Sequence, residues 1–173
     1  MGVGTKRWTV ADFGTLTDDR WRYEVVDGWL EVSPPEAAWR HGVGGRLRRQ
    51  IEAQAPAEWF VDAELPVQLG DGWRQPDLAV VRSDVPLTRA LQLWRPEHVG
   101  LLVEIVSASS TVRDRVDKPR QYAAAGIPYY WRVETEPTVV LHAAGIVLSS
   151  GRAVLPAPFA VEIDVDALQI PSG

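Results

Sequence analysis

Cysteine is absent from the 173 residues of this chain, and its absence removes several kinds of chemistry at once. A chain without cysteine has no thiol nucleophile, no disulfide and no cysteine-ligated zinc. Long apolar runs are also missing, because no stretch approaches the roughly 18 residues that a membrane-spanning helix needs. The segment from Met1 to Asp12 lacks the basic and then apolar layout of a signal peptide. We therefore expect a cytoplasmic protein.

Positive charge is scarce as well. The formal net charge is −5, which argues against a protein that coats nucleic acid through bulk electrostatic attraction. It leaves open an enzyme that touches DNA through one local basic face and a metal ion. The basic residues are 16 arginines and two lysines, Lys6 and Lys118. Because lysine is so rare in this chain, Lys118 is a candidate functional residue. The alternative is that the excess of arginine over lysine reflects a GC-rich or heat-adapted genome and that a lysine at 118 is due to chance.

The composition that is present is that of an ordinary globular protein. Hydrophobic residues make up 46% of the chain and charged residues 24%, which argues against disorder. We find no internal repeat, no linker and no low-complexity stretch. The length suits one domain, so residues 1–173 are expected to form a single domain with a core of their own.

Local patterns predict an α/β (α+β) fold, with a central mixed β-sheet flanked by helices. Asp27-Gly28 lies between two alternating apolar runs, which is the strongest short-range signal of a β-hairpin. Val43, Leu47 and Ile51 recur every four residues with arginines between them, which predicts an amphipathic helix with Arg40, Arg46, Arg48 and Arg49 available to its polar face. Helices are expected at residues 10–16, at 36–55 and after a loop at 107–111, and strands at 22–32, 58–69, 73–81, 99–106, 127–134 and 138–142, with small strands near the end.

Glu104 is the most unusual residue of the apolar runs. It lies in Val99-Gly-Leu-Leu-Val-Glu-Ile-Val106, a segment typical of a strand that is buried on both sheet faces. An unpartnered carboxylate is costly to bury there, so a metal ion or a paired cation is expected beside it. A glutamate at the strand end that reaches solvent or pairs with an arginine is the plainer interpretation.

Asp77 stands at the start of a second apolar strand, in Gln75-Pro76-Asp77-Leu-Ala-Val-Val. Aspartate is a poor strand residue, and a turn-capping role just before the strand is the alternative. If the two strands are neighbours, Asp77 and Glu104 converge on one cation. Oxygen ligands favour a hard ion, so Mg²⁺ is expected, with Mn²⁺ as a substitute. Zinc is the weaker prediction, because the chain has no cysteine and three scattered histidines.

Lys118 lies in Asp114-Arg-Val-Asp-Lys118-Pro-Arg-Gln-Tyr122. In a helix, residues 114, 118 and 122 share one face, which would aim the ammonium at a phosphate or a nucleophilic water. Pro119 disfavours helical geometry at the residue before it and is best tolerated in the first helical turn. We therefore expect a kink, or a helix that starts here. A solvated, charged helix end is the alternative interpretation.

Taken in order, these segments resemble a known family. The match runs from about residue 9 to residue 143, which is most of the chain. It includes Tyr23-Glu24-Val-Val-Asp27-Gly28, Pro76-Asp77-Leu-Ala-Val-Val, Val103-Glu104-Ile-Val-Ser107 and Asp114…Lys118…Tyr122-Ala-Ala-Ala-Gly126. This set is similar to the bacterial "putative restriction endonuclease" family of the PD-(D/E)XK nuclease superfamily. Each segment alone is weakly specific, whereas the ordered set is specific.

The resemblance implies a restriction-endonuclease-like core in which Asp77 and Glu104 are Mg²⁺ ligands. Glu24 matches an acidic residue of the family's opening segment that is often counted as part of the site. The superfamily pattern has a lysine two residues after the glutamate, where this chain has Val106. The family supplies the lysine from the following helix instead, and Lys118 is the matching position. The implied reaction is metal-assisted hydrolysis of a DNA phosphodiester bond, with these four charged residues in the catalytic site.

Three functional classes stay open. The first is an active Mg²⁺-dependent DNA endonuclease, and the second is an inactive nuclease-fold protein that serves as a nucleic-acid-binding or assembly module. The third is a hydrolase of another phosphate substrate. His41 and Tyr122 are candidates at the edge of the site, although a surface histidine and a packing tyrosine are the plainer interpretations. Eight tryptophans indicate an oligomer surface or core packing, and a homodimer would suit cleavage of both DNA strands.

Overall fold

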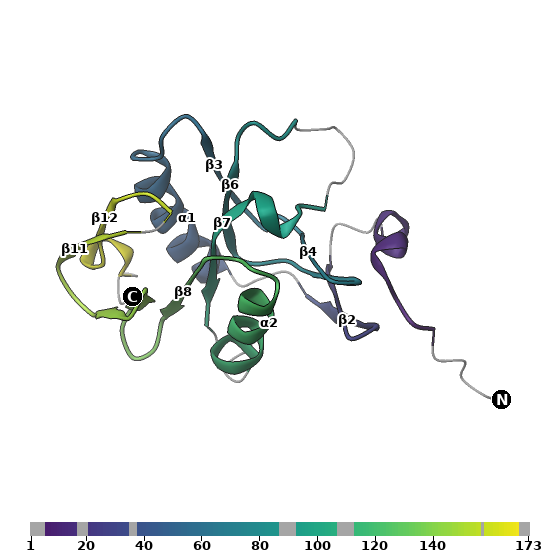
Figure 1. The fold of residues 1–173 in the computed structure, drawn as a ribbon. Coiled ribbons are helices and arrows are strands. Elements are labelled where there is room, and N and C mark those ends of the chain that lie inside the picture. The colour runs from purple at the N-terminus through teal and green to yellow at the C-terminus, as the bar shows by residue number, and fades with distance from the viewer. Residues whose placement is uncertain are drawn as a thin grey trace.

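The structure of the chain is a computed structural model, and it describes residues 6–16, 21–34, 38–86, 93–106, 113–156 and 158–169. Helices and strands build the predicted mixed α+β architecture (Figure 1). The helices are α1 (Ala38–Glu52) and α2 (Lys118–Ala124), with 3-10 helices at Val10–Thr15, Pro96–His98 and Asp166–Leu168 and a π-helical turn at Arg113–Asp117. The strands are β1 (Arg22–Val26), β2 (Trp29–Ser33), β3 (Trp59–Ala63), β4 (Val67–Leu69), β5 (Gly72–Arg74), β6 (Leu78–Arg82), β7 (Val99–Ile105), β8 (Tyr129–Glu134), β9 (Val140–Ala143), β10 (Ile146–Leu148), β11 (Arg152–Leu155) and β12 (Val161–Asp164).

The largest sheet is mixed, as the sequence predicts. Its strand order is β10-β9-β8-β7-β6-β3, in which β7 and β8 run parallel and the other neighbouring strands run antiparallel. Strand β7 lies inside the sheet, and all seven of its residues are buried. This burial explains the nearly continuous apolar sequence of β7, in which Glu104 is the one charged residue. A smaller sheet has the order β2-β1-β5-β4, and β11 pairs with β12.

Helices cover both faces of the large sheet (Figure 1). Val43, Leu47 and Ile51 of α1 pack on one face, against every second residue of β6 and β7. Tyr122 of α2 packs on the opposite face, against the alternate residues of the same strands. This division follows from strand geometry, because successive side chains point to opposite faces. At the end of β7, Arg40 of α1 contacts the carbonyl oxygen of Ile105, and Lys118 of α2 contacts Glu104.

Two predicted strands are each broken in the structure. The run at residues 58–69 forms β3 and β4 in different sheets, because the chain turns at Glu64, whose φ is +55°, and at Pro66. The run at residues 73–81 forms β5 and β6, which the segment Gln75-Pro76-Asp77 separates. The prediction of continuous strands was wrong because proline has no N–H to continue a ladder. At both breaks the chain passes between the large and the small sheet, so Asp77 lies at their junction.

The other predicted elements are confirmed within a few residues. The hairpin turns at Asp27 and Gly28, whose φ values of +50° and +79° suit an Asp-Gly turn. The helix predicted at 36–55 is α1, and the one at 10–16 is a 3-10 helix. The loop predicted at 107–111 lies outside the described residues. In the ranges given above, no helix combines the length and the apolar composition that crossing a membrane requires.

Candidate active site

Four charged residues that the sequence marks lie together where the two sheets meet. Glu24 belongs to β1 of the small sheet, Lys118 starts α2, and the other two stand at the adjacent ends of β6 and β7. The exposed fractions of Glu24, Asp77, Glu104 and Lys118 are 3%, 5%, 0% and 2%. Buried charges are tolerated when they are paired or bind a metal ion. The partners of each group therefore decide what the cluster can do.

Glu104 is held by two groups of α2. The Nζ of Lys118 lies 2.7 Å from its Oε2, and the hydroxyl of Tyr122 donates a hydrogen bond of 2.6 Å to its Oε1. Lys118 and Tyr122 are four residues apart, so one face of the helix presents both groups to the same carboxylate. Burial, together with the negative charges of Glu104 and Glu24, raises the pKa of Tyr122 well above its ordinary value. The phenol therefore stays protonated and remains a donor.

Pro119 does not keep Lys118 away from the site. Helix α2 starts at Lys118, and Pro119 lies in its first turn, where the missing N–H has no intrahelical partner to lose. The π-helical turn Arg113–Asp117 leads into it. The α-helical part therefore starts at Lys118, as one of the two predictions has it, but the chain is already helical before it, in the π-helical turn. The side chain of Asp114, which the pattern places on the same face, lies outside the described part of the chain.

Asp77 is held by two guanidinium groups and by the backbone of β7. Arg22 Nη2 donates to its Oδ1 at 3.0 Å, and Arg40 Nη2 donates to its Oδ2 at 2.9 Å. The backbone N–H of Ile105 donates to Oδ2 as well. Because Ile105 follows Glu104, this hydrogen bond ties Asp77 to the strand end that carries the second carboxylate. The two carboxylates therefore lie at the same edge of the large sheet.

Glu24 is linked to the cluster through Arg74, a buried arginine of β5. Arg74 Nη1 donates to Glu24 Oε2 at 3.1 Å and to Glu31 Oε2 at 2.9 Å, while its Nε donates to Gln121 of α2 at 3.0 Å. The Nζ of Lys118 lies 3.9 Å from Glu24 Oε1. Burial acts to raise the pKa of Glu24, but the positive charges of Lys118 and Arg74 outweigh it and lower the pKa. Glu24 therefore stays ionised and connects the small sheet to α2.

Sequence reasoning missed the part that arginines play in this site. Arg40 was expected on the polar face of a helix, and Arg22 and Arg74 were given no role, yet all three contact the buried carboxylates. The sequence does contain an indication for Arg74. This charged residue directly precedes Gln75-Pro76, and the proline interrupts the strand at the point where the chain passes from the small to the large sheet. His41, the histidine candidate, has an exposed side chain.

The donor set of the cluster fits a hard divalent cation. Asp77 and Glu104 offer carboxylate oxygens, and Mg²⁺ binds through one or two carboxylates while it keeps several waters. One of these carboxylates is already bound by a nitrogen cation, because Arg40 Nη2 donates to Asp77 Oδ2 and also to the backbone carbonyl oxygen of Ile105. Zinc sites need three or four protein ligands. Across the residues that the structure describes, no group of three or more His, Cys, Asp or Glu is arranged to hold a metal.

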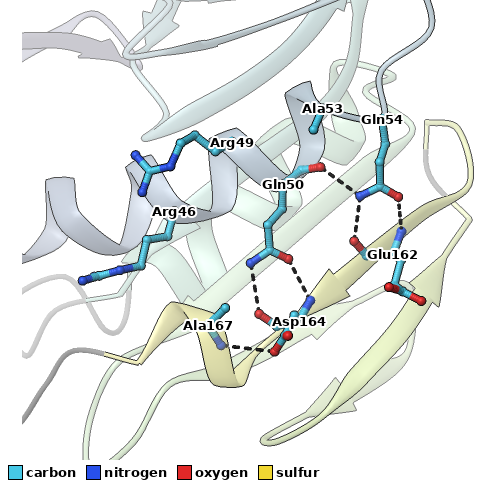
Figure 2. Close-up of a pocket in the computed structure, with 8 residues that line it drawn as sticks. All are labelled: Arg46, Arg49, Gln50, Ala53, Gln54, Glu162, Asp164 and Ala167. Carbon is cyan, nitrogen blue, oxygen red and sulfur yellow. Dashed lines mark hydrogen bonds between the residues drawn. The ribbon is translucent and has the colours of Figure 1, made fainter.

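A second polar region lies toward the other end of α1 (Figure 2). Gln50 exchanges two hydrogen bonds, of 2.7 and 3.0 Å, with the backbone of Asp164, and Gln54 exchanges two, of 2.8 and 2.9 Å, with the backbone of Glu162. These neutral amides satisfy the edge of β12 that β11 leaves unpaired. The contact borders a pocket of about 580 Å³, which is lined by Arg46, Arg49, Gln50, Ala53, Gln54, Glu162, Asp164 and Ala167. This pocket includes none of the four site residues.

Comparison with known proteins identifies the fold and the family. No curated protein matches the chain at a significant level. The crystal structure of "a putative nuclease belonging to DUF820" from Anabaena variabilis ATCC 29413 matches with a TM-score of 0.69, over 92% of this chain and 96% of that chain. Its sequence identity is 18%, so this likeness shows the fold alone. The sequence profile of the Uma2 family, described as "Putative restriction endonuclease", matches residues 10–145. Because this segment is well over half of the chain and contains the whole cluster, the protein belongs to the Uma2 family.

Proposed function

We propose that this protein is a Mg²⁺-dependent endonuclease that hydrolyses phosphodiester bonds of DNA. One observation carries the proposal: Lys118 forms a direct ion pair with Glu104, whose strand is hydrogen-bonded to Asp77. The lysine and the two carboxylates that the family resemblance implies are thus parts of one connected cluster. The description of the family, "Putative restriction endonuclease", supports the same reaction class.

Asp77 and Glu104 are the residues that would hold the metal ion. When bound, Mg²⁺ or Mn²⁺ would supply a polarised phosphate oxygen and a water of lowered pKa. Both carboxylates stand at the ends of central strands, and sites built on such rigid elements are more precise than sites built on loops. The ion pair with Glu104 holds the ammonium group of Lys118 next to these carboxylates.

Lys118 is proposed to orient the attacking water or to stabilise the charge that develops on the phosphate. Its ion pair with Glu104 and its approach to Glu24 aim the ammonium into the carboxylate cluster. A guanidinium at this position would be bulkier and planar, with a fixed fork of donors. This difference gives a reason for a lysine at 118 in a chain that uses arginine nearly everywhere else.

DNA is the proposed substrate, and the contact with it would be local. The net charge of −5 gives no overall attraction to phosphate. Helix α1, which begins beside the cluster, carries further arginines along its length (Arg46, Arg48 and Arg49). Two of these, Arg46 and Arg49, are drawn in Figure 2 on the rim of the pocket. A basic helix next to the carboxylates would let phosphates approach an otherwise acidic protein.

A second function is favoured by one observation, which is that the buried carboxylates are already paired. Each has a cation within 3.1 Å: Glu24 has Arg74, Asp77 has Arg22 and Arg40, and Glu104 has Lys118. A buried network with these pairings is compensated without a metal ion. The alternative is therefore a nuclease-fold protein without catalysis that binds nucleic acid or takes part in an assembly.

Cleavage of plasmid DNA and of a matched RNA, with Mg²⁺, with Mn²⁺ and with a chelator, tests the proposal. The site variants are Asp77→Asn, Glu104→Gln and Lys118→Met. The matched controls are Asp84→Asn and Lys6→Met, which remove charges from ion pairs outside the cluster. We expect metal-dependent DNA cleavage that the controls retain and the site variants lose. Cleavage that survives all three site substitutions contradicts the proposed site, and binding without cleavage supports the alternative.

A further inference from the structure

Arg40 places a positive charge on one proposed metal ligand and beside the backbone of the residue that follows the other. Its Nη2 donates to Asp77 Oδ2 at 2.9 Å and also to the carbonyl oxygen of Ile105. The first oxygen belongs to a proposed metal ligand, and the second belongs to the residue that follows the other proposed ligand, Glu104. One positively charged nitrogen is therefore shared by oxygens from both strand ends.

Arg22, the second arginine on Asp77, is placed differently. It contacts the other carboxylate oxygen, Oδ1, at 3.0 Å, and its Nη2 also lies 3.5 Å from Glu64 Oε1. The two oxygens of one carboxylate can accept from separate partners at the same time. Arg22 can therefore keep its contact while Oδ2 changes partner. Arg40 and a metal ion bound to Oδ2 would exclude each other.

The position of Arg40 in α1 allows its side chain to leave without unfolding the helix. Arg40 is the third residue of α1, and the helix is anchored further along by Val43, Leu47 and Ile51. The side chain of Arg40 is 12% exposed, whereas that of Asp77 is 3% exposed. A long arginine side chain at the rim of a buried cluster can turn its charged end toward water.

We propose that Arg40 is an internal counter-ion that a divalent metal ion displaces from Asp77 and from the Ile105 carbonyl. This inference rests on the proposed metal-dependent function. Without metal, Arg40 compensates the buried carboxylate, since an unpaired charge there would destabilise the fold. With metal, the ion takes over this role. The apparent metal affinity is the intrinsic affinity multiplied by the fraction of molecules in which Arg40 has left the site, so this residue lowers that affinity.

Calorimetric titration of the full chain with MnCl₂, without nucleic acid, tests the displacement. Wild type is compared with Arg40→Gln and with Arg48→Gln, which changes an arginine of the same helix that pairs with Glu52 and Asp62 outside the cluster. We expect Arg40→Gln to bind Mn²⁺ about tenfold more tightly, because a charge-assisted hydrogen bond no longer competes. Arg48→Gln should bind as wild type does. Asp77→Asn should weaken the binding strongly in either background.

Thermal unfolding gives a second readout that a purely structural role of Arg40 would not produce. Without metal, Arg40→Gln should melt at a lower temperature than wild type, because Asp77 loses one of its partners. Saturating Mn²⁺ should raise the melting temperature of Arg40→Gln more than that of wild type, since the tighter complex is stabilised more. Arg40→Lys keeps the charge with a shorter reach and should bind Mn²⁺ with an intermediate affinity.

The outcomes separate the role of Arg40 from the function on which it rests. Suppose that wild type binds Mn²⁺ and that Asp77→Asn weakens this binding. If Arg40→Gln then binds Mn²⁺ no more tightly than wild type, the displacement is overturned and the metal function stands. If Arg40→Gln does not fold, wild-type affinity in Arg40→Lys overturns the displacement in the same way. No Mn²⁺ binding by wild type, or binding that Asp77→Asn does not weaken, overturns the metal function and the displacement together.

Discussion

Helix α1 makes two polar contacts of opposite character. Near its start, Arg40 reaches into the charged cluster around Asp77. Toward its end, Gln50 and Gln54 pair with the backbone of β12 (Figure 2). Both contacts satisfy polar groups that would be costly to leave without a partner. The first is made of charges, which in our proposal exchange partners with a metal ion, and the second is made of neutral amides.

The glutamine contact has a structural role, whereas the Arg40 contact belongs to the proposed catalytic site. An amide side chain that both donates to and accepts from a strand has no proton to transfer near neutral pH and no charge to attract a metal ion. The cluster instead concentrates buried carboxylates and cations, and buried charges of this kind are a recurrent feature of functional sites. Substitutions in the cluster should therefore change activity and metal binding, whereas substitutions of the glutamines should change stability alone.

The largest expected effect is that of Lys118→Met on DNA cleavage. Removal of a group that stabilises charge at the reacting centre should lower the rate by about 100- to 1000-fold. Lys118→Arg should restore little activity, because a planar guanidinium does not replace a compact ammonium. Single-turnover nicking of plasmid DNA measures both rates, with Lys6→Met as the matched control. A Lys118→Met rate within about tenfold of wild type would remove this lysine from the reaction.

The double substitution Gln50→Ala with Gln54→Ala should lower the free energy of unfolding. Four hydrogen bonds to β12 are lost, and at about 0.5–1.5 kcal/mol each the loss is about 2–6 kcal/mol. Urea denaturation measures it, and the Mn²⁺ affinity of the folded variant should equal that of wild type. A changed Mn²⁺ affinity would show that the two contacts of α1 are coupled, and the contrast between them would fail.

Tyr122→Phe should have a smaller effect on stability. It removes the hydroxyl that donates to the buried carboxylate of Glu104, which costs about 1.5 kcal/mol of unfolding free energy. Cleavage should fall by much less than in Lys118→Met, because the ion pair of Glu104 remains. Tyr129→Phe, in β8, is the matched control for loss of a tyrosine hydroxyl. A Tyr122→Phe variant as inactive as Lys118→Met would make the tyrosine a catalytic residue.

The smallest expected effect is a pH dependence that comes from Glu24. Its pKa is lowered below the ordinary value of 4.5, so its ion pairs stabilise the fold above that value. This stabilisation is lost as the pH falls through the pKa of the folded state. As the pH falls below 4.5, the unfolding free energy of wild type should therefore fall more steeply than that of Glu24→Gln. Equal slopes in parallel denaturation series would mean that Glu24 is not paired as the structure shows.

Part of this arrangement could be predicted from the chain because its signals are local. A carboxylate inside the apolar run of β7 marks Glu104, and an aspartate at the mouth of a second apolar run marks Asp77. Asp27-Gly28 fixes the hairpin through its own backbone geometry. The position of Lys118 is not local, since it depends on how α2, which lies between the parallel strands β7 and β8 in the sequence, packs on a face of the sheet. The family resemblance supplied it, and the pairing with Glu104 agrees.

The rest could not be predicted because it depends on contacts between distant segments. Periodicity shows which residues are apolar, but it does not show that the chain changes sheets at Glu64 and at Pro76. Arginine is long and flexible, so its partner is decided by tertiary packing. Arg40 looked like any other charge on a polar helix face, whereas it contacts an aspartate 37 residues away. Arg74 was hidden by its place in a strand that the sequence did not show to be broken.

In the proposed site, a divalent metal ion binds Asp77 and Glu104 and displaces Arg40. Anomalous diffraction from crystals of the full chain grown with MnCl₂ would locate this ion. We expect an anomalous peak in contact with both carboxylates, with the Arg40 guanidinium moved away from Asp77 Oδ2. No peak at saturating Mn²⁺, with Arg40 still bound to Asp77, would contradict it.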